Sequence, residues 1–156
     1  MEAAAEDIGY WYSSWLWGMP LIAVTVMLHA AGLVLVRDMM QRFIASRADR
    51  GAALHLNLAA VMGMAAGLVT LLHLLEASVW AAAYVVVLSA LPTPHVAMLY
   101  SVSAMTAYGH AALFLTPRWQ MLGALESLNG LILFGLSTAF LYGIIQRAWP
   151  AGGRPH

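Results

Sequence analysis

The sequence predicts an all-α membrane protein with three transmembrane helices and a shorter re-entrant segment between the second and the third. Of its 156 residues, 62% are hydrophobic and only 9% are charged, whereas soluble domains usually carry about 25% charged residues. The few charges leave three long stretches almost uncharged, which is the pattern of helices that span a bilayer. The chain has no cysteine and no net charge, so we expect no disulfide, no thiolate metal site and no nucleic-acid partner.

The first predicted transmembrane helix covers residues 15–36, a run of 22 residues without a charge. At about 1.5 Å per residue, this run is long enough for a hydrocarbon core of about 30 Å. The residues before it are acidic, unlike the basic start of a signal peptide, so we expect this helix to remain in the mature protein. Residues 37–53 are polar and contain four arginines, and we expect a short helix there that lies along the membrane interface.

The second and third predicted transmembrane helices cover residues 54–91 and 119–146. Two prolines end the second helix, and Glu126 is the only charge within the third. Residues 95–105 between them are apolar enough to enter a bilayer but too short to cross it, so we predict a re-entrant helix surrounded by protein or by a water-filled cavity. The second helix also has a row of small residues that would let another helix approach closely: Ala59, Gly63 and Gly67.

The placement of the arginines predicts the orientation in the membrane. With the N-terminus outside, six of the seven arginines (37, 42, 47, 50, 147 and 154) face the cytoplasm and only Arg118 lies outside, as the positive-inside rule favours. The re-entrant segment then enters from the outer face, and residues 148–156 form a short cytoplasmic tail. The absence of lysine and the abundance of alanine favour a bacterial source, so we expect the protein in the bacterial inner membrane.

Three groups of residues form a pattern that a known family shares. The second helix carries His73, Glu76, Trp80 and Ala81, and the re-entrant segment carries Leu99, Tyr100 and Ser101. The third helix contributes the longest match: Trp119, Leu122, Gly123, Glu126, Asn129, Gly130, Phe134, Gly135, Ser137, Thr138, Ala139 and Phe140. Through these residues, roughly residues 70–147 resemble bacterial potassium-channel-like proteins with two pore-forming helices per subunit.

The resemblance implies a fold and a function. It makes residues 54–147 a pore domain, with an outer helix over 54–91, a pore helix over 95–105, a filter loop over 106–110 and an inner helix over 119–146. Residues 1–53 would add an extra N-terminal transmembrane helix and its connector. Four subunits would surround a central pore as a homotetramer, and monovalent cations would pass through it passively.

The filter-like loop departs from the family pattern. A potassium filter reads Thr-x-Gly-Tyr-Gly-Asp, and its backbone carbonyls replace the water shell of the ion. Here Thr106, Ala107, Tyr108 and Gly109 would form the narrowest point, one glycine is missing, and His110 stands where the family has an acidic residue. We therefore expect altered or lost potassium selectivity. A ring of four His110 imidazoles would make the pore mouth sensitive to pH; the alternative is a histidine in a water-exposed loop.

Five residues of the third helix are candidates for lining or gating the pore: Glu126, Gly130, Phe134, Gly135 and Thr138. A carboxylate inside a membrane is costly and usually faces the protein interior. Glu126 would either attract cations behind the filter or accept hydrogen bonds from the backbone of the pore helix. The glycines would either act as hinges, because glycine weakens a helix, or allow close packing between helices.

His73 and Glu76 are three residues apart on one helical face, and Trp80 continues that face. We expect a structural polar face there; the alternatives are a proton-sensitive contact and half of a metal site. The prediction includes no metal ion and no other cofactor apart from a permeant cation.

Other classes of protein fit the sequence less well. No nucleophile with its base, carboxylate pair or phosphate loop is visible, so we do not expect an enzyme. One alternative is a non-conducting channel homologue that acts as an accessory membrane protein, which the altered filter favours. Another is a haem or quinone protein that uses His29 and His55. We expect both near the cytoplasmic face, and neither helix adds a second histidine at a comparable depth to complete a pair, which disfavours this alternative.

Overall fold

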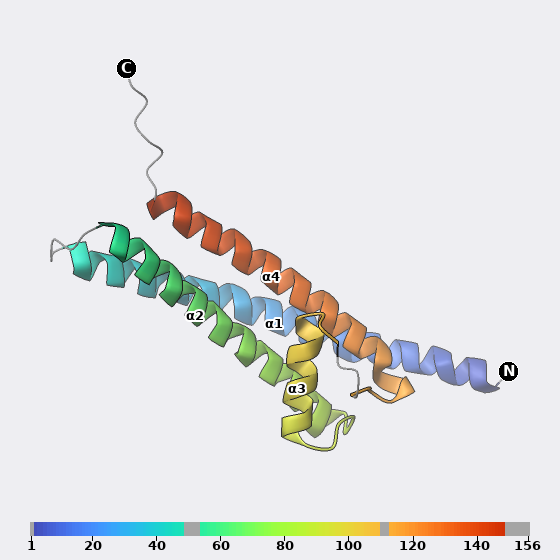
Figure 1. Ribbon diagram of the computed structural model, residues 1–156. Helices are drawn as coiled ribbons and strands as arrows, with labels where there is room; N and C mark the ends of the chain where they lie inside the picture. Colours follow the sequence, from blue (N-terminus) through green and yellow to red (C-terminus); the bar gives the residue numbers. More distant parts are fainter. Residues whose placement is uncertain (1, 49–53, 110–112, 149–156) are drawn as a thin grey trace.

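The computed structural model describes residues 2–48, 54–109 and 113–148 (Figure 1). Three long helices lie side by side: α1 (Glu2–Ala48), α2 (Leu54–Ala82) and α4 (Gln120–Ala148). Three segments are long and apolar enough to cross a membrane, namely Gly9–Phe43, Ala59–Val87 and Pro117–Gln146. The prediction of an all-helical chain with three helices of transmembrane length is therefore confirmed.

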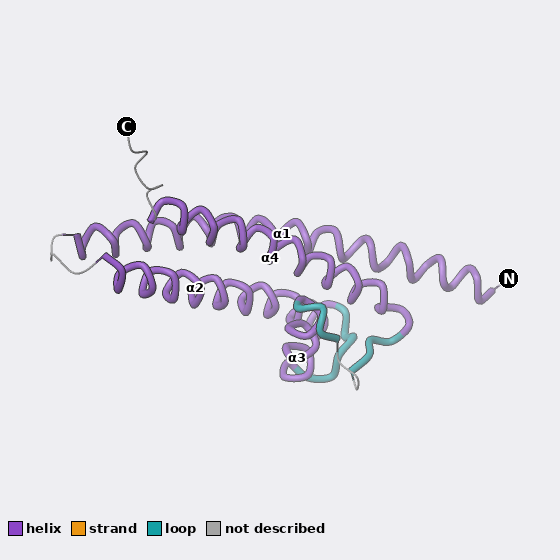
Figure 2. Tube along the Cα trace, turned by 45° about the horizontal axis from the view of Figure 1, so that its top comes forward, coloured by secondary structure: helices purple, strands orange, loops and turns teal. Residues whose placement is uncertain are grey.

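A short helix, α3 (Pro94–Met105), lies between α2 and α4 in the chain and contacts both of them. Figure 2 shows the three long helices running together, with α3 and its flanking loops gathered where α2 ends and α4 begins. The chain enters α4 through a single 3-10 turn, Pro117–Trp119. The predicted third helix over 119–146 thus begins in this turn, and α4 continues two residues further.

Helix α1 continues beyond the predicted end of the first helix. The expectation of a separate short helix after residue 36 is wrong for residues 37–48, which extend α1 without a break; residues 49–53 lie outside the described part of the chain. Residues 37–48 contain no glycine or proline that would end a helix. Val36 and Met40 are also buried against side chains of α2, and this packing stabilises the arginine-rich end of α1 as helix.

Helix α2 ends earlier than predicted. It ends at Ala82 and is followed by a π-helical turn, Ala83–Val87, so the helical path stops four residues before the expected end at residue 91. Helix α3 then begins at a capped N-terminus, where Oγ1 of Thr93 accepts a hydrogen bond from the N–H of Val96 (3.3 Å). Pro94 occupies the first turn, where its missing N–H costs nothing.

Glycines allow α1 to approach its neighbours closely. A Cβ atom on Gly18 would lie 2.5 Å from Cδ1 of Leu125, and one on Gly32 would lie 2.6 Å from Leu72. The predicted row of small residues on α2 behaves differently, because Gly63 and Gly67 have open space where a Cβ would be. Within the described chain, no helix packs against that row.

Candidate functional site

Helix α3 lies where α2 ends and α4 begins, and its two ends contact different levels of α4. Ala97, near the start of α3, is buried with Trp80 and Tyr84 close to the end of α2. At the other end of α3, the carbonyl of Met105 lies directly against Gly130 of α4. Gly130 lies close to the middle of the apolar segment Pro117–Gln146. The carboxyl end of this 12-residue helix therefore lies close to the middle of that apolar segment, and the chain enters α4 through Pro117.

The carboxyl end of α3 is closed by a Schellman motif. The N–H of Ala107 donates to the carbonyl of Ala104 (2.9 Å), and the N–H of Tyr108 donates to the carbonyl of Ser103 (3.0 Å). Ala107 adopts a left-handed backbone with a φ of 54°. This conformation is free for glycine but costs roughly 1–2 kcal/mol for a residue with a Cβ atom. Ala107 is therefore a strained point of the turn, at the place where glycine is the usual residue.

The four described residues of the predicted filter loop are exposed on the single chain. The side chain of Tyr108 is 84% exposed. The hydroxyl of Thr106 donates to the carbonyl of Val102 (2.9 Å), and Gly109 has a φ of 69°. His110 lies outside the described residues. A pocket of ≈ 260 Å³ opens beside this loop, between α3 and the start of α4.

Glu126 is fully buried where α2, α3 and α4 meet. The hydroxyl of Tyr84, near the end of α2, donates to its Oε2 (2.8 Å). The buried hydroxyl of Ser101, in α3, lies beside the same carboxylate. Side chains, rather than the backbone of α3, thus surround the predicted carboxylate. Glu126 links the three elements and does not lie on an open surface of the single chain.

The other predicted pore-lining residues have different surroundings. A Cβ atom on Gly130 would collide with the backbone of Met105, so this glycine has the geometry of close packing. Gly135 has open space around it, and Thr138 is exposed. Phe134 is 40% exposed, and its ring stacks on that of His73 with 4.5 Å between the ring centroids.

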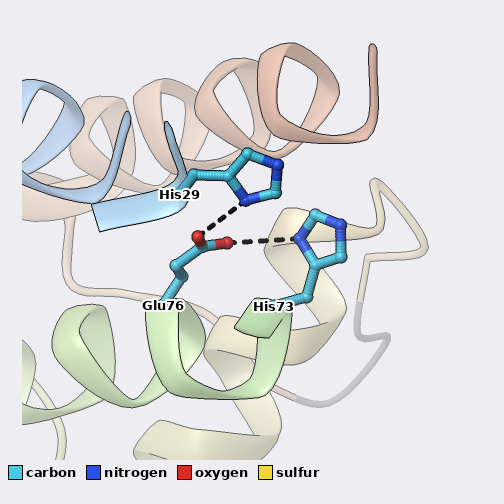
Figure 3. A group of neighbouring side chains, drawn as sticks. All are labelled: His29, His73 and Glu76. Carbon is cyan, nitrogen blue, oxygen red and sulfur yellow. Dashed lines mark hydrogen bonds and ion pairs between the residues drawn. The ribbon is translucent and has the colours of Figure 1, made fainter. Parts of the chain in front are cut away.

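A buried polar cluster joins the three long helices, and Figure 3 shows its members from α1 and α2. Nδ1 of His29, in α1, donates to Oε1 of Glu76 in α2 (2.8 Å), and Nδ1 of His73 lies 3.2 Å from Oε2 of Glu76. Oγ of Ser137, in α4, lies 3.1 Å from Nε2 of His29 and 3.0 Å from Nε2 of His73. These four residues are called the histidine cluster below. His29 and Glu76 are fully buried, and His73 retains 13% of its side-chain exposure.

The structure brings together two of the three residues of the predicted polar face. His73 and Glu76 belong to the histidine cluster, whereas the ring of Trp80 is fully buried in the apolar cluster between α2, α3 and α4. The indole Nε1 of Trp80 has no hydrogen-bond partner among the described residues. Trp80 therefore serves the packing around α3 rather than the polar contacts of α2.

The expectation that no second histidine lies at the depth of His29 is wrong. With a first helix that ends at residue 36, His29 would lie near the cytoplasmic end of the bundle. Helix α1 in fact ends at Ala48, so His29 lies 19 residues before that end, and His73 lies 19 residues after the start of α2. The two helices run in opposite directions, and equal spacing from their connection places both histidines at one depth. This spacing is the sequence signal that identifies the pair.

Two further contacts attach α1 to the rest of the chain. Nδ2 of Asn129 donates to Oγ1 of Thr25 (2.8 Å), and both side chains are buried. Nearer the N-terminus, the hydroxyl of Ser14 donates to the carbonyl of Arg118 (3.3 Å). The first helix is thus joined by polar contacts at two levels, to α4 and to the 3-10 turn that precedes it.

No protein-family model matches the chain, and neither a curated protein nor a solved structure is significantly similar to it. The resemblance to potassium-channel-like proteins therefore stays a prediction from the residues that carry it. The side chain of His55 lies outside the described residues, so the haem or quinone alternative also stays a prediction.

Proposed function

We propose that this chain is the pore-forming subunit of a homotetrameric, potassium-channel-like membrane channel that passes monovalent cations passively. The observation that supports the proposal most is the path of α3. This helix ends against Gly130, close to the middle of the apolar segment Pro117–Gln146, and is followed by a turn of four exposed residues. Inside a bilayer, such a turn is tolerated only against protein or a water-filled cavity.

The direction of α3 favours a cation at its inner end. The carboxyl end of a helix carries about half a negative elementary charge, because the dipoles of its peptide groups are aligned. In α3 this end lies at the depth of Gly130, near the middle of the apolar span. A cation is least well solvated at that depth, so a helix end aimed there stabilises a permeant cation where stabilisation is needed.

Exposed residues around the turn favour self-association. Tyr108 is 84% exposed and Phe114 is 76% exposed on the single chain. One re-entrant segment cannot enclose a pore by itself, so several copies have to meet through closed symmetry with heterologous contacts. The family resemblance sets the number of copies at four. Tyr108 and Phe114 would then contact neighbouring subunits or the pore.

The proposal includes weak or altered selectivity for potassium. Selective filters use a stack of carbonyl rings that replaces the hydration shell of the ion. The loop here lacks one glycine of the family motif, and Ala107 occupies a left-handed position. A shorter loop supplies fewer carbonyl rings, so sodium would pass more easily than through an intact potassium filter.

The orientation follows from the arginines. With the N-terminus outside the bacterial inner membrane, Arg37 and Arg42, which are exposed, face the cytoplasm, as the positive-inside rule favours. The turn after α3 then opens toward the outer face, and the C-terminal tail lies in the cytoplasm.

Ion flux into liposomes tests the proposal. Purified protein is reconstituted, and uptake of potassium, sodium and protons is compared for the wild type, Thr106→Ala and Thr70→Ala. Thr70 is a matched control, because it is exposed on α2 and its hydroxyl makes the same bond to the carbonyl four residues earlier (2.9 Å). We expect flux that Thr106→Ala abolishes or re-orders among the ions and that Thr70→Ala leaves unchanged.

Other outcomes would support one of the alternative functions. If every ion is excluded at neutral and at acidic pH, the chain is a non-conducting homologue, and its role is that of an accessory membrane protein. If the purified protein shows a Soret absorption band, it binds haem. Native mass spectrometry in detergent completes the test, because a monomer without higher assemblies contradicts a pore built from four copies.

A further inference from the structure

The histidine cluster takes no part in the proposed pore, yet it gathers the ligands of a metal site. The ligand atoms of His29, His73 and Glu76 all lie within 4.8 Å of one another. Two imidazoles and one carboxylate are also the protein ligands of several zinc sites that keep one position open. The sequence indicated only half of such a site, on α2; the structure adds the third ligand from α1.

A count of hydrogens shows that the cluster is incomplete with neutral imidazoles. Each neutral imidazole carries one N–H, and Nδ1 of His29 uses its hydrogen to bond Glu76 (2.8 Å). Nε2 of His29 therefore accepts the hydroxyl hydrogen of Ser137, whose oxygen then accepts the N–H of His73 at Nε2. This assignment, made from the hydrogen-bond network, leaves Nδ1 of His73 without a hydrogen.

A nitrogen atom without a hydrogen faces an oxygen atom without a hydrogen-bond donor. Nδ1 of His73 lies 3.2 Å from Oε2 of Glu76, and neither atom has a hydrogen-bond partner among the described residues. Two lone pairs that face each other in a buried site repel, and an unpaired buried polar atom costs roughly 1–3 kcal/mol. A cation between the imidazoles and the carboxylate removes both costs.

We propose that His29, His73 and Glu76 bind one divalent transition-metal ion, for which Zn²⁺ is the probe. Imidazole nitrogen suits zinc, copper, iron and nickel, whereas magnesium and calcium prefer oxygen ligands. Both Nδ1 atoms would bind the ion together with the carboxylate of Glu76. The ion would connect α1 to α2 at the centre of the span Ala59–Val87.

Ser137 provides the outer contacts that such a site needs. Metal-binding histidines usually donate their second N–H to a fixed acceptor, which orients the ring. With metal on both Nδ1 atoms, both Nε2 atoms carry hydrogen, and the two lone pairs of the Ser137 hydroxyl accept them at 3.1 and 3.0 Å. The hydroxyl hydrogen is then free to bond its own helix, as that of Thr138 bonds the carbonyl of Phe134 (2.8 Å).

Charge limits which occupants fit. Glu76 cancels one of the two charges of a divalent ion, and a hydroxide as the fourth ligand would cancel the other. One additional proton on an imidazole would satisfy the same contacts without a metal ion. The experiment therefore has to separate a metal ion from a proton.

Metal binding is measured on the full-length protein in detergent, after a chelator has removed bound ions. Zn²⁺ is titrated in competition with a chromophoric chelator, and Co²⁺ is titrated while its visible absorption is recorded. We expect one ion per chain and a Co²⁺ spectrum of nitrogen and oxygen ligands. His29→Ala and His73→Ala should abolish this binding, whereas His95→Ala, an exposed histidine at the start of α3, should not change it.

Ser137→Ala keeps the proposal testable if the ligand variants fail to fold. This change retains all three ligands and removes only the outer acceptor, so we expect affinity for Zn²⁺ to fall about 10- to 100-fold at unchanged stoichiometry. Zn²⁺, but not Mg²⁺, should also raise the unfolding temperature of the wild type. The proposal is overturned if the wild type binds no Zn²⁺ at one ion per chain, or if binding survives in His29→Ala and His73→Ala. Neither result bears on ion flux, so the channel proposal stands or falls separately.

Discussion

The histidine cluster and the carboxyl end of α3 are fixed by different kinds of contact. In the cluster, side chains from three helices hold one another, and His29 and Glu76 are fully buried. At the end of α3, backbone hydrogen bonds close the turn, and the side chains of residues 106–109 are exposed. One chain therefore encloses the first region, whereas the second presents groups that only another copy, a pore or lipid can cover.

The difference indicates that the histidine cluster stabilises the fold and that the exposed turn after α3 supplies functional groups. Buried polar networks are costly unless every member is satisfied, and they then hold one arrangement of helices. Exposed turns on a rigid frame carry binding groups in many proteins. The predictions below test whether the cluster stabilises the chain more than the turn does.

The largest effect is expected from Glu76→Ala. Removal of this carboxylate leaves the fully buried imidazole of His29 without its acceptor, and loss of one partner of a buried pair typically costs about 3–5 kcal/mol. The free energy of unfolding, from denaturant titration in detergent with a chelator present, measures the loss. Asp38→Ala is the control, because Asp38 is exposed on α1 and should change stability by less than about 0.5 kcal/mol. Equal losses in the two variants would contradict the scaffold role of the cluster.

Gly130→Ala should be the next most damaging change. The added Cβ meets the backbone of Met105, so α3 has to move, and overpacking of this kind costs about 3 kcal/mol at the upper end of its usual range. The same unfolding titration measures it. Gly135→Ala is the matched control on the same helix, because its Cβ meets open space and alanine favours a helix by about 1 kcal/mol. A stable Gly130→Ala protein would refute the close contact between α3 and α4.

Tyr84→Phe is expected to cost about 2 kcal/mol. It removes the hydroxyl that donates to Glu126, and a buried acceptor left without its donor costs about 1–3 kcal/mol. Unfolding of Tyr12→Phe provides the comparison, since Tyr12 is 69% exposed. If both variants unfold alike, Glu126 does not depend on Tyr84, and its link between α2 and α4 is weaker than the distance indicates.

The smallest effect is expected from Ala107→Gly, and its sign is opposite. Glycine adopts the left-handed backbone of this position without strain, so we expect a gain of about 1 kcal/mol. Ala104→Gly, inside α3, should instead lose about 1 kcal/mol, because glycine disfavours a helix interior. A loss of stability in Ala107→Gly, measured in the same titration, would show that the turn does not have this conformation.

Parts of this arrangement were predictable from the sequence. Runs of apolar residues gave the three long helices, and Pro94 together with the short apolar run after it gave α3 to within one residue. The continuation of α1 to Ala48 was not predictable from hydropathy, because the stretch is polar and is stabilised by packing of Val36 and Met40 on α2. That error in helix length concealed the match in depth between His29 and His73.

The partners of the candidate residues were harder to predict than their positions. The sequence predicts that Glu126 faces the protein interior. Its hydrogen-bond donor, Tyr84, lies 42 residues away and reaches it only because the helices pack together. Ser137 likewise matched the family pattern without any sign that it bonds two histidines. Such contacts depend on the register of neighbouring helices, which periodicity within one helix does not define.

The central claim is that the turn after α3 lines a pore. The most direct test introduces a cysteine in this turn and measures whether a thiol reagent blocks ion flux. The chain has no cysteine, so a thiol reagent acts only at the introduced position. Liposomes with Tyr108→Cys are compared before and after the reagent with liposomes that contain Tyr12→Cys on α1, whose tyrosine is also exposed. The account predicts cation flux in both variants and block by the reagent in Tyr108→Cys alone. Absence of flux in Tyr12→Cys, or equal sensitivity of the two variants to the reagent, would contradict a pore at residues 106–109.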